Sequence, residues 1–258
     1  MKEYKHIEYS DVCPKYNYLD LYLPDGDCKA VFVYMHGGGL IVPEPHNLKC
    51  HPFIVDLCAN GVGVATIEYR GFPRFKYPDF IEDAAKSVKW LKDNISTYGK
   101  CNKIFVGGSS AGGYLSMMLC FDKKYLNAVG LNPTDIDGYI HDAGQPTTHL
   151  NVLNEYGFDR KRVIVDEKSP MYHVGEEENY SPMLFLVSTK DMSCRLEQTK
   201  VMVKLLEDFG HKDIVFLEIP DGKHCEHTWK INENGESVFT NYVVKFRKAI
   251  SQNLGEKK

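Results

Sequence analysis

The sequence predicts an α/β fold with a mostly parallel central sheet that is covered by helices on both faces. Short runs rich in β-branched and aromatic residues alternate with segments whose apolar residues recur at helical spacing. The strand-like runs are apolar along most of their length, as in strands buried on both faces. No repeat or linker divides the 258 residues, of which 43% are apolar, so one large core is expected.

The expected strands are short, and most of them are followed by glycine or polar residues. The first of them is followed directly by His36-Gly37-Gly38-Gly39, and the third leads into a second glycine-rich turn. In order along the chain, they are Ala30–Met35, Val62–Tyr69, Lys103–Gly107, Asn127–Leu131, Met183–Ser188 and Ile214–Ile219.

The expected helices lie between these strands and after the last one. Gly61 and Gly210 close two of them, as glycine commonly does at a helix C-terminus. Apolar residues three or four positions apart mark the others. The helical segments are His51–Asn60, a segment spanning Ile81 to Ile95, Ala111–Phe121, a segment spanning Leu196 to Phe209, and a closing segment from Val238 to Ile250.

A long span breaks the alternation between Asn132 and Pro182. It is rich in Pro, Gly, His and Asp and is too long for an ordinary connection. Parallel sheets bind ligands at the carboxyl ends of their strands. We therefore expect residues 1–258 to form a single domain, in which a cap or lid at about 133–182 lies over a site at that edge.

Charge and hydropathy exclude several classes of partner. The formal net charge is −4, and no basic stripe is present to bind a phosphate backbone, so no nucleic acid is expected. No apolar run reaches the roughly 18–20 residues of a membrane span, so no membrane partner is expected. The start of the chain lacks the apolar core of a signal peptide, which favours the cytoplasm. A homodimer is left open.

The eight cysteines form no C-x-x-C pair and are scattered along a chain that needs no covalent staples. We therefore expect free thiols. Because the histidines and cysteines never fall at paired ligand spacing, the sequence predicts no metal site.

The most specific motif is Gly108-x-Ser110-x-Gly112, which lies between an expected strand and an expected helix. In the nucleophile elbow, this pattern gives a tight turn that lifts the serine hydroxyl to the edge of the sheet. Glycine is needed at the flanks because side chains there would collide. A glycine-rich turn with an incidental serine is the alternative interpretation.

A serine nucleophile needs a histidine to accept its proton and an acid to orient that histidine. Asp191 follows the strand Met183–Ser188, and His224 and His227 follow the last strand, so all reach the carboxyl edge. The chain order Ser110, Asp191, His224 is that of hydrolases with this elbow. His224 is favoured as the base because it lies closer to the strand end, and His227 is the alternative. Asp221 and Glu226 are rival acids in the histidine's own loop.

The motifs HGGG and GGSSAGG, with Asp191 and a late histidine, resemble the hormone-sensitive-lipase-like branch of the α/β-hydrolases and its neighbouring microbial esterases. The likeness runs from about Ala30 to His224. It implies the α/β-hydrolase fold, with Ser110 as nucleophile and the N–H groups of Gly38, Gly39 and Ala111 as an oxyanion hole. The chain departs from the branch in its short N-terminal lead-in and in Ser188, where a glycine is common.

These residues predict a serine esterase that cleaves small-molecule esters through an acyl-enzyme and needs no cofactor. Short acyl or aryl esters are favoured, including esters on carbohydrates. Two alternatives stay open: a peptidase of the prolyl-oligopeptidase type, and a non-catalytic protein that binds small molecules on the same scaffold. Five further histidines, at positions 46, 51, 141, 149 and 173, are expected at the pocket edge or on the surface.

Overall fold

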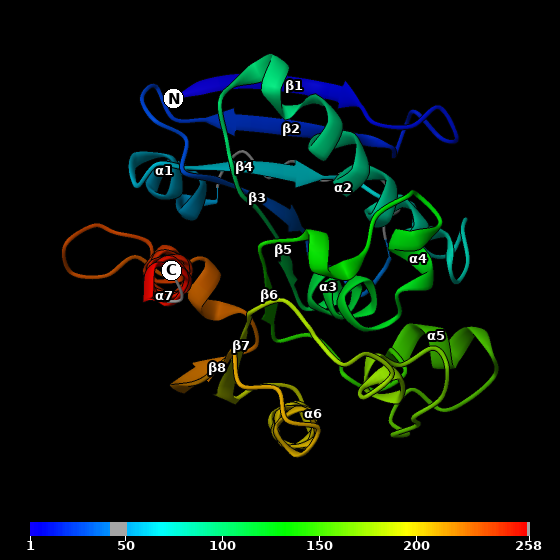
Figure 1. Cartoon of the computed structure of the whole chain (residues 1–258). Coiled ribbons are helices and arrows are strands. Elements are labelled where there is room, and N and C mark those ends of the chain that lie inside the picture. Colours follow the sequence, from blue (N-terminus) through cyan, green and yellow to red (C-terminus); the bar gives the residue numbers. More distant parts are fainter. Residues whose placement is uncertain (42–50, 257–258) are drawn as a thin grey trace.

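A computed structural model describes residues 1–41 and 51–256, with side chains up to residue 250. Its centre is an eight-stranded sheet in the order β1-β2-β4-β3-β5-β6-β7-β8 (Figure 1). The strands from β4 to β8 run parallel, whereas β2 is antiparallel to both β1 and β4. The strands are β1 (Lys2–Glu8), β2 (Tyr18–Leu23), β3 (Ala30–Met35), β4 (Val62–Ile67), β5 (Ile104–Ser109), β6 (Gly138–Asp142), β7 (Met183–Lys190) and β8 (Ile214–Lys223).

Helices cover both faces of this sheet, as expected (Figure 1). On one face, α1 (Pro52–Ala59) and α7 (Val238–Glu256) pack on β3 through a cluster that includes Phe32, Phe53 and Phe239. On the other face lie α2 (Asp79–Tyr98), α3 (Ala111–Phe121) and α6 (Arg195–Asp208). The remaining helical segments are α4 (Lys124–Asn127), η1 (Pro133–Asp135), α5 (Leu150–Glu155), η2 (Pro170–His173) and η3 (Glu226–Thr228).

Two strand assignments from the sequence need correction. The segment Asn127–Leu131 is not a strand: α4 ends at Asn127 and a turn follows. The strand in that part of the sheet is β6, inside the span expected to form a cap. The sequence also gave no sign of β1 and β2, which extend the sheet beyond β4.

The expectation of free thiols is wrong for one pair, because Cys28 and Cys101 form a disulfide. Cys28 lies in the segment that leads into β3 and Cys101 in the segment that leads into β5, and these strands are parallel neighbours. The disulfide therefore joins the amino ends of two adjacent central strands.

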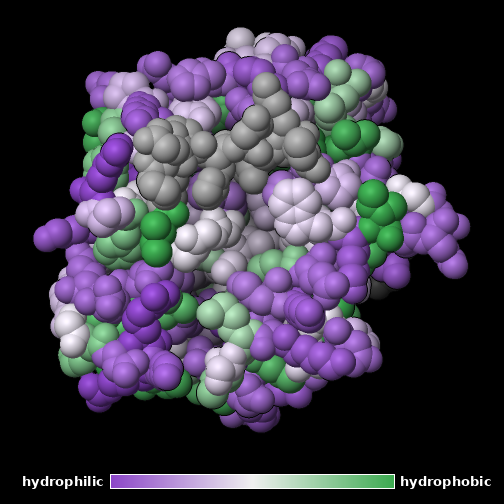
Figure 2. Space-filling view, turned by 180° about the vertical axis from the view of Figure 1, so that it is seen from behind, coloured by the Kyte–Doolittle hydropathy of each residue, from purple (hydrophilic) through white to green (hydrophobic). Residues whose placement is uncertain are grey.

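On the face seen in Figure 2, hydrophilic residues predominate and apolar residues lie in small, separate groups. Within residues 1–41 and 51–256, no helix combines the length and the apolar character that a bilayer crossing requires.

Candidate active site

Ser110 lies in a strained turn between β5 and α3. Its φ of 58° and ψ of −111° place it in a region that non-glycine residues rarely occupy. The flanking glycines allow the turn because α3 approaches the end of β3 very closely. A Cβ on Gly108 would lie 2.3 Å from the carbonyl oxygen of Met35, and one on Gly112 would lie 1.9 Å from it. The local geometry is therefore that of the predicted elbow.

The structure brings Ser110, His224 and Asp191 together at the carboxyl edge of the sheet. His224 Nε2 lies 2.8 Å from Ser110 Oγ, and His224 Nδ1 lies 2.6 Å from Asp191 Oδ1. The carboxylate follows β7 and its side chain is 1% exposed, whereas the imidazole follows β8 and is 27% exposed. A buried acid, an imidazole and a hydroxyl thus form one hydrogen-bonded series that opens to solvent at the hydroxyl end.

His227, the alternative base, makes a different contact. Its Nε2 lies 2.8 Å from Asp142 Oδ1, and both side chains are almost fully buried. Burial alone would lower the pKa of His227, but the charge and hydrogen bond of Asp142 outweigh it, and the pKa is raised. Ser109 Oγ donates to the other oxygen of Asp142 at 2.5 Å and accepts from Tyr34 Oη at 3.1 Å. Tyr34, Ser109 and Asp142 were missed in the sequence because their roles depend on contacts across strands.

The two rival acids are engaged elsewhere. The carboxylate of Asp221 is largely exposed and pairs with Lys190 at 2.7 Å. Glu226 accepts the backbone N–H of Lys223 at 3.0 Å and pairs with Lys230 at 3.1 Å. Of the carboxylates near this loop, it is Asp191 that hydrogen-bonds to His224.

The glycine-rich loop after β3 faces the elbow. Gly38 and Gly39 have φ values of 115° and 68°, which glycine adopts without a steric penalty. In the described part of the chain, no hydrogen bond occupies the backbone N–H of Gly38, Gly39 or Ala111. Asn151 Nδ2, at the start of α5, donates to the carbonyl of Gly39 and fixes that peptide. These N–H groups are therefore free to bind an oxyanion.

A cavity of about 390 Å³ opens beside Ser110 and His224. It is also lined by His36, His51 and Trp229. The Trp229 indole is 56% exposed and lies 3.8 Å from the His51 ring, centroid to centroid. Burial and the neighbouring His36 lower the pKa of His51 to about 4, so its ring is neutral at pH 7. The cavity thus offers an aromatic wall with little charge.

The other histidines differ from expectation. His141, His149 and His173 are buried inside the protein rather than at the pocket edge or on the surface. Burial lowers the pKa of both His141 and His149 to about 3. His46 lies outside the described residues. Within the described ranges, no three His, Cys, Asp or Glu side chains are grouped so that they could hold a metal ion.

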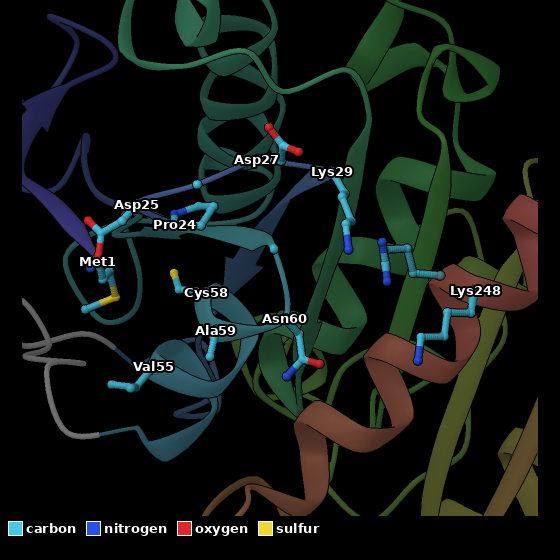
Figure 3. Close-up of a pocket in the computed structure, with 13 residues that line it drawn as sticks. Met1, Pro24, Asp25, Asp27, Lys29, Val55, Cys58, Ala59, Asn60 and Lys248 are labelled. Carbon is cyan, nitrogen blue, oxygen red and sulfur yellow. Dashed lines mark hydrogen bonds and ion pairs between the residues drawn. The ribbon is translucent and has the colours of Figure 1, made fainter.

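A larger cavity, of about 680 Å³, lies away from this site (Figure 3). It is lined by residues before β3 and before β4, such as Lys29 and Asn60, and by Lys248 of α7. These positions are at the amino ends of the parallel strands, the edge opposite Ser110. The volume of a cavity alone therefore does not identify the candidate active site.

Comparisons with known proteins agree with this fold. A family described as "alpha/beta hydrolase fold" matches residues 32–141. The chain is 24% identical over 231 residues to the probable carboxylic ester hydrolase LipM of Mycobacterium tuberculosis, covering 81% of this chain and 53% of LipM. It is 34% identical over 120 residues to the probable isoprenylcysteine alpha-carbonyl methylesterase ICMEL2 of Arabidopsis thaliana, covering 44% and 27% of the two chains. The chain thus spans about half the length, or less, of these curated relatives.

Solved structures extend the likeness to the whole chain. A truncated carbohydrate esterase from gut microbiota superposes with a TM-score of 0.79 at 16% identity, covering 97% of both chains. Esterase B from Lactobacillus rhamnosis gives a TM-score of 0.76 at 18% identity, covering 100% of this chain and 87% of that one. At such identities the likeness establishes the fold, which is the one that the motifs predict. The chain has the α/β-hydrolase fold.

Proposed function

We propose that this chain is a serine esterase that cleaves carboxylic esters of small molecules. The observation that carries the proposal is the hydrogen-bonded series from Asp191 through His224 to Ser110 at the edge of the sheet. An imidazole between a carboxylate and a hydroxyl is the arrangement that turns serine into a nucleophile. The esterase names of the curated relatives and of the solved structures support the same chemistry.

The proposed reaction is acyl transfer in two steps. Ser110 Oγ attacks the ester carbonyl while His224 Nε2 accepts its proton, and Asp191 stabilises the resulting imidazolium. The N–H groups of Gly38, Gly39 and Ala111 hold the oxyanion of the tetrahedral intermediate. Protonated His224 then gives its proton to the leaving alcohol. Water, deprotonated by His224, cleaves the acyl-enzyme and releases the acid, so no cofactor takes part.

The small cavity beside Ser110 supports short acyl or aryl esters as substrates. Its aromatic wall, with Trp229 exposed, suits flat groups, including those attached to carbohydrates. A panel of acetyl, butyryl, octanoyl and feruloyl esters, run beside peptide anilides, ranks these substrates and measures any peptidase activity.

The decisive variant is Ser110→Ala. It should abolish hydrolysis of 4-nitrophenyl acetate and labelling by a fluorophosphonate probe, with an unchanged circular dichroism spectrum. Ser109→Ala is the matched control, because its hydroxyl faces Asp142 and Tyr34 rather than His224. Undiminished turnover by the Ser110→Ala variant would reject the assignment, and a wild-type protein that resists the probe would favour a non-catalytic binding protein.

Other properties of the whole chain stay proposals. We expect residues 1–258 to act as one domain, with the part of 133–182 outside β6 as a cap. A homodimer is testable by light scattering. The sequence predicts a cytoplasmic location. The Cys28–Cys101 disulfide argues against that prediction, because disulfides persist mainly in oxidising compartments. Cell fractionation combined with thiol labelling tests it.

A further inference from the structure

A third cavity, of about 290 Å³, lies between the segment that follows Asp191 and the start of α5. Met192, Ser193 and Cys194 form one wall, and Leu150 forms part of another. The residue after Leu150 is Asn151, which holds the carbonyl of Gly39. The cavity therefore adjoins both the loop of the proposed acid and the helix that supports the oxyanion loop.

Cationic side chains dominate the lining of this cavity. Arg160, Lys161 and Arg162 come from the loop after α5, and Arg195 is the first residue of α6. Among the described residues, no carboxylate lines the cavity and none lies within ion-pair distance of these four cations. The carboxylate of the same loop, Asp159, accepts the backbone N–H of Lys161. Four cationic residues thus line one cavity, and no described carboxylate pairs with them.

The charge of Arg195 is energetically unfavourable in this position. Its side chain is buried, and its guanidinium donates to two neutral oxygens, the carbonyl of Ala143 and Gln145 Oε1. Burial lowers the pKa of Arg195, and the more distant charge of Asp191 offsets only part of this effect. The positive end of the α6 dipole lies at the same place. A buried cation with neutral partners is unfavourable unless an anion joins it.

We propose that this cavity binds a carboxylate that is carried by the ester substrate. Arginine pairs with carboxylates through two parallel hydrogen bonds, and the cavity lies beside the loop of the proposed acid and the helix that supports the oxyanion loop. The preferred substrates are then esters with a second, negatively charged group in the acyl or alcohol part. This inference rests on the proposed esterase function and narrows its substrate class.

The first test compares charged esters with neutral partners of similar size. For the acyl part, the pair is the 4-nitrophenyl monoester of glutaric acid and 4-nitrophenyl valerate. For the alcohol part, the pair is 4-acetoxybenzoate and 4-acetoxybenzamide. In at least one pair we expect kcat/KM to favour the charged ester by on the order of tenfold or more, as one charge-assisted contact provides. The preference should shrink as salt is added, because these charges are partly exposed.

The variants Arg160→Gln and Arg162→Gln change exposed side chains and are expected to fold. Each should lower kcat/KM for the charged ester by roughly tenfold and leave the neutral ester within about twofold. Lys245→Gln, which removes an exposed cation on α7, is the control and should change neither. Equal kcat/KM for charged and neutral esters in both pairs, with hydrolysis intact, would overturn the inference.

A binding measurement separates this inference from the proposed function. Titration calorimetry should show that the wild type binds disodium glutarate and that the double variant Arg160→Gln/Arg162→Gln does not. If no ester is hydrolysed, the esterase proposal fails, and glutarate binding alone decides whether the cavity is a carboxylate site. If the wild type binds inorganic phosphate but prefers no charged ester, the cavity serves a free anion, and the assignment to substrate is wrong.

Discussion

Replacing His227 by glutamine should destabilise the protein far more than it slows the chemistry. His227 and Asp142 are almost fully buried, and their hydrogen bond of 2.8 Å joins η3 to the end of β6. Glutamine cannot carry the positive charge of the imidazolium, so the buried carboxylate loses its cationic partner. Loss of one member of a buried ion pair costs about 3–5 kcal/mol, a large share of the roughly 5–15 kcal/mol that stabilises a typical domain.

The pH dependence of this effect has a defined sign. Since the folded pKa of His227 is raised, its contribution is fully present below the unfolded pKa of roughly 6.5 and is lost as the pH rises through the folded value. The difference in unfolding free energy between wild type and the His227→Gln variant should therefore be larger at pH 6 than at pH 9. Urea unfolding, followed by tryptophan fluorescence at both pH values, measures it.

A double-mutant cycle and an activity assay complete this test. The Asp142→Asn/His227→Gln protein should lose less stability than the sum of the single variants, because no charge stays buried alone. At a temperature where all variants are folded, His227→Gln should keep most of its esterase activity, whereas His224→Gln should lose about 10³-fold or more. Equal losses of activity in both variants, with unchanged stability in His227→Gln, would refute this division of roles.

Three further predictions concern packing and covalent structure. Gly112→Ala should give insoluble or inactive protein, since the new methyl group would meet a backbone carbonyl, whereas Gly26→Ala, in open space, should leave Tm and activity unchanged. Phe239→Ala should lower the unfolding free energy by about 3–5 kcal/mol, because the ring is fully buried in an aromatic cluster, and a loss below 1 kcal/mol in urea unfolding would contradict that packing. Cys101→Ser opens a covalent loop with a sequence separation of 73 and should cost up to about 4 kcal/mol; dithiothreitol should lower the Tm of the wild type and not that of the variant.

The central strands and the site could be predicted because their signals are local. Apolar runs such as Ala30–Met35 are buried on both faces, and the polar residues that follow parallel strands meet at one edge. That rule alone predicted that Asp191 and His224 lie at the same edge of the sheet as Ser110. Choosing His224 over His227 depended on distance from the strand end, which agrees with the observed hydrogen bonds.

The missed strands lack such a signal. In β1, polar and charged residues occupy most positions, as suits an antiparallel strand at the edge of the sheet. In β6, the buried residues His141 and Asp142 would be unfavourable without partners. Those partners, Ser116 and His227, come from distant segments. The run Asn127–Leu131 is more apolar than β6, so the sequence pattern favoured the wrong segment.

The Cys28–Cys101 disulfide could not be predicted from the sequence for a different reason. The spacing of the cysteines along the chain does not identify the bonded pair, but the register of the strands does. Cys28 and Cys101 are separated by the same number of residues as Val31 and Ile104, which are paired in β3 and β5. Once β3 and β5 are known to be parallel neighbours, the two cysteines must meet. That adjacency is a property of the topology, which the composition of the chain does not reveal.

Some of the reactive groups follow strands in the middle of the sheet and another follows its terminal strand, which affects how heat inactivates the protein. The hydroxyl and the N–H donors lie in segments that directly follow β3 and β5, which have neighbours on both sides, whereas the imidazole follows β8, the terminal strand. Outer strands detach more readily than inner ones, since fewer contacts hold them. Mild heating should therefore abolish the proposed esterase activity while most of the backbone remains protected from hydrogen exchange, and cooling should restore that activity without refolding of the core.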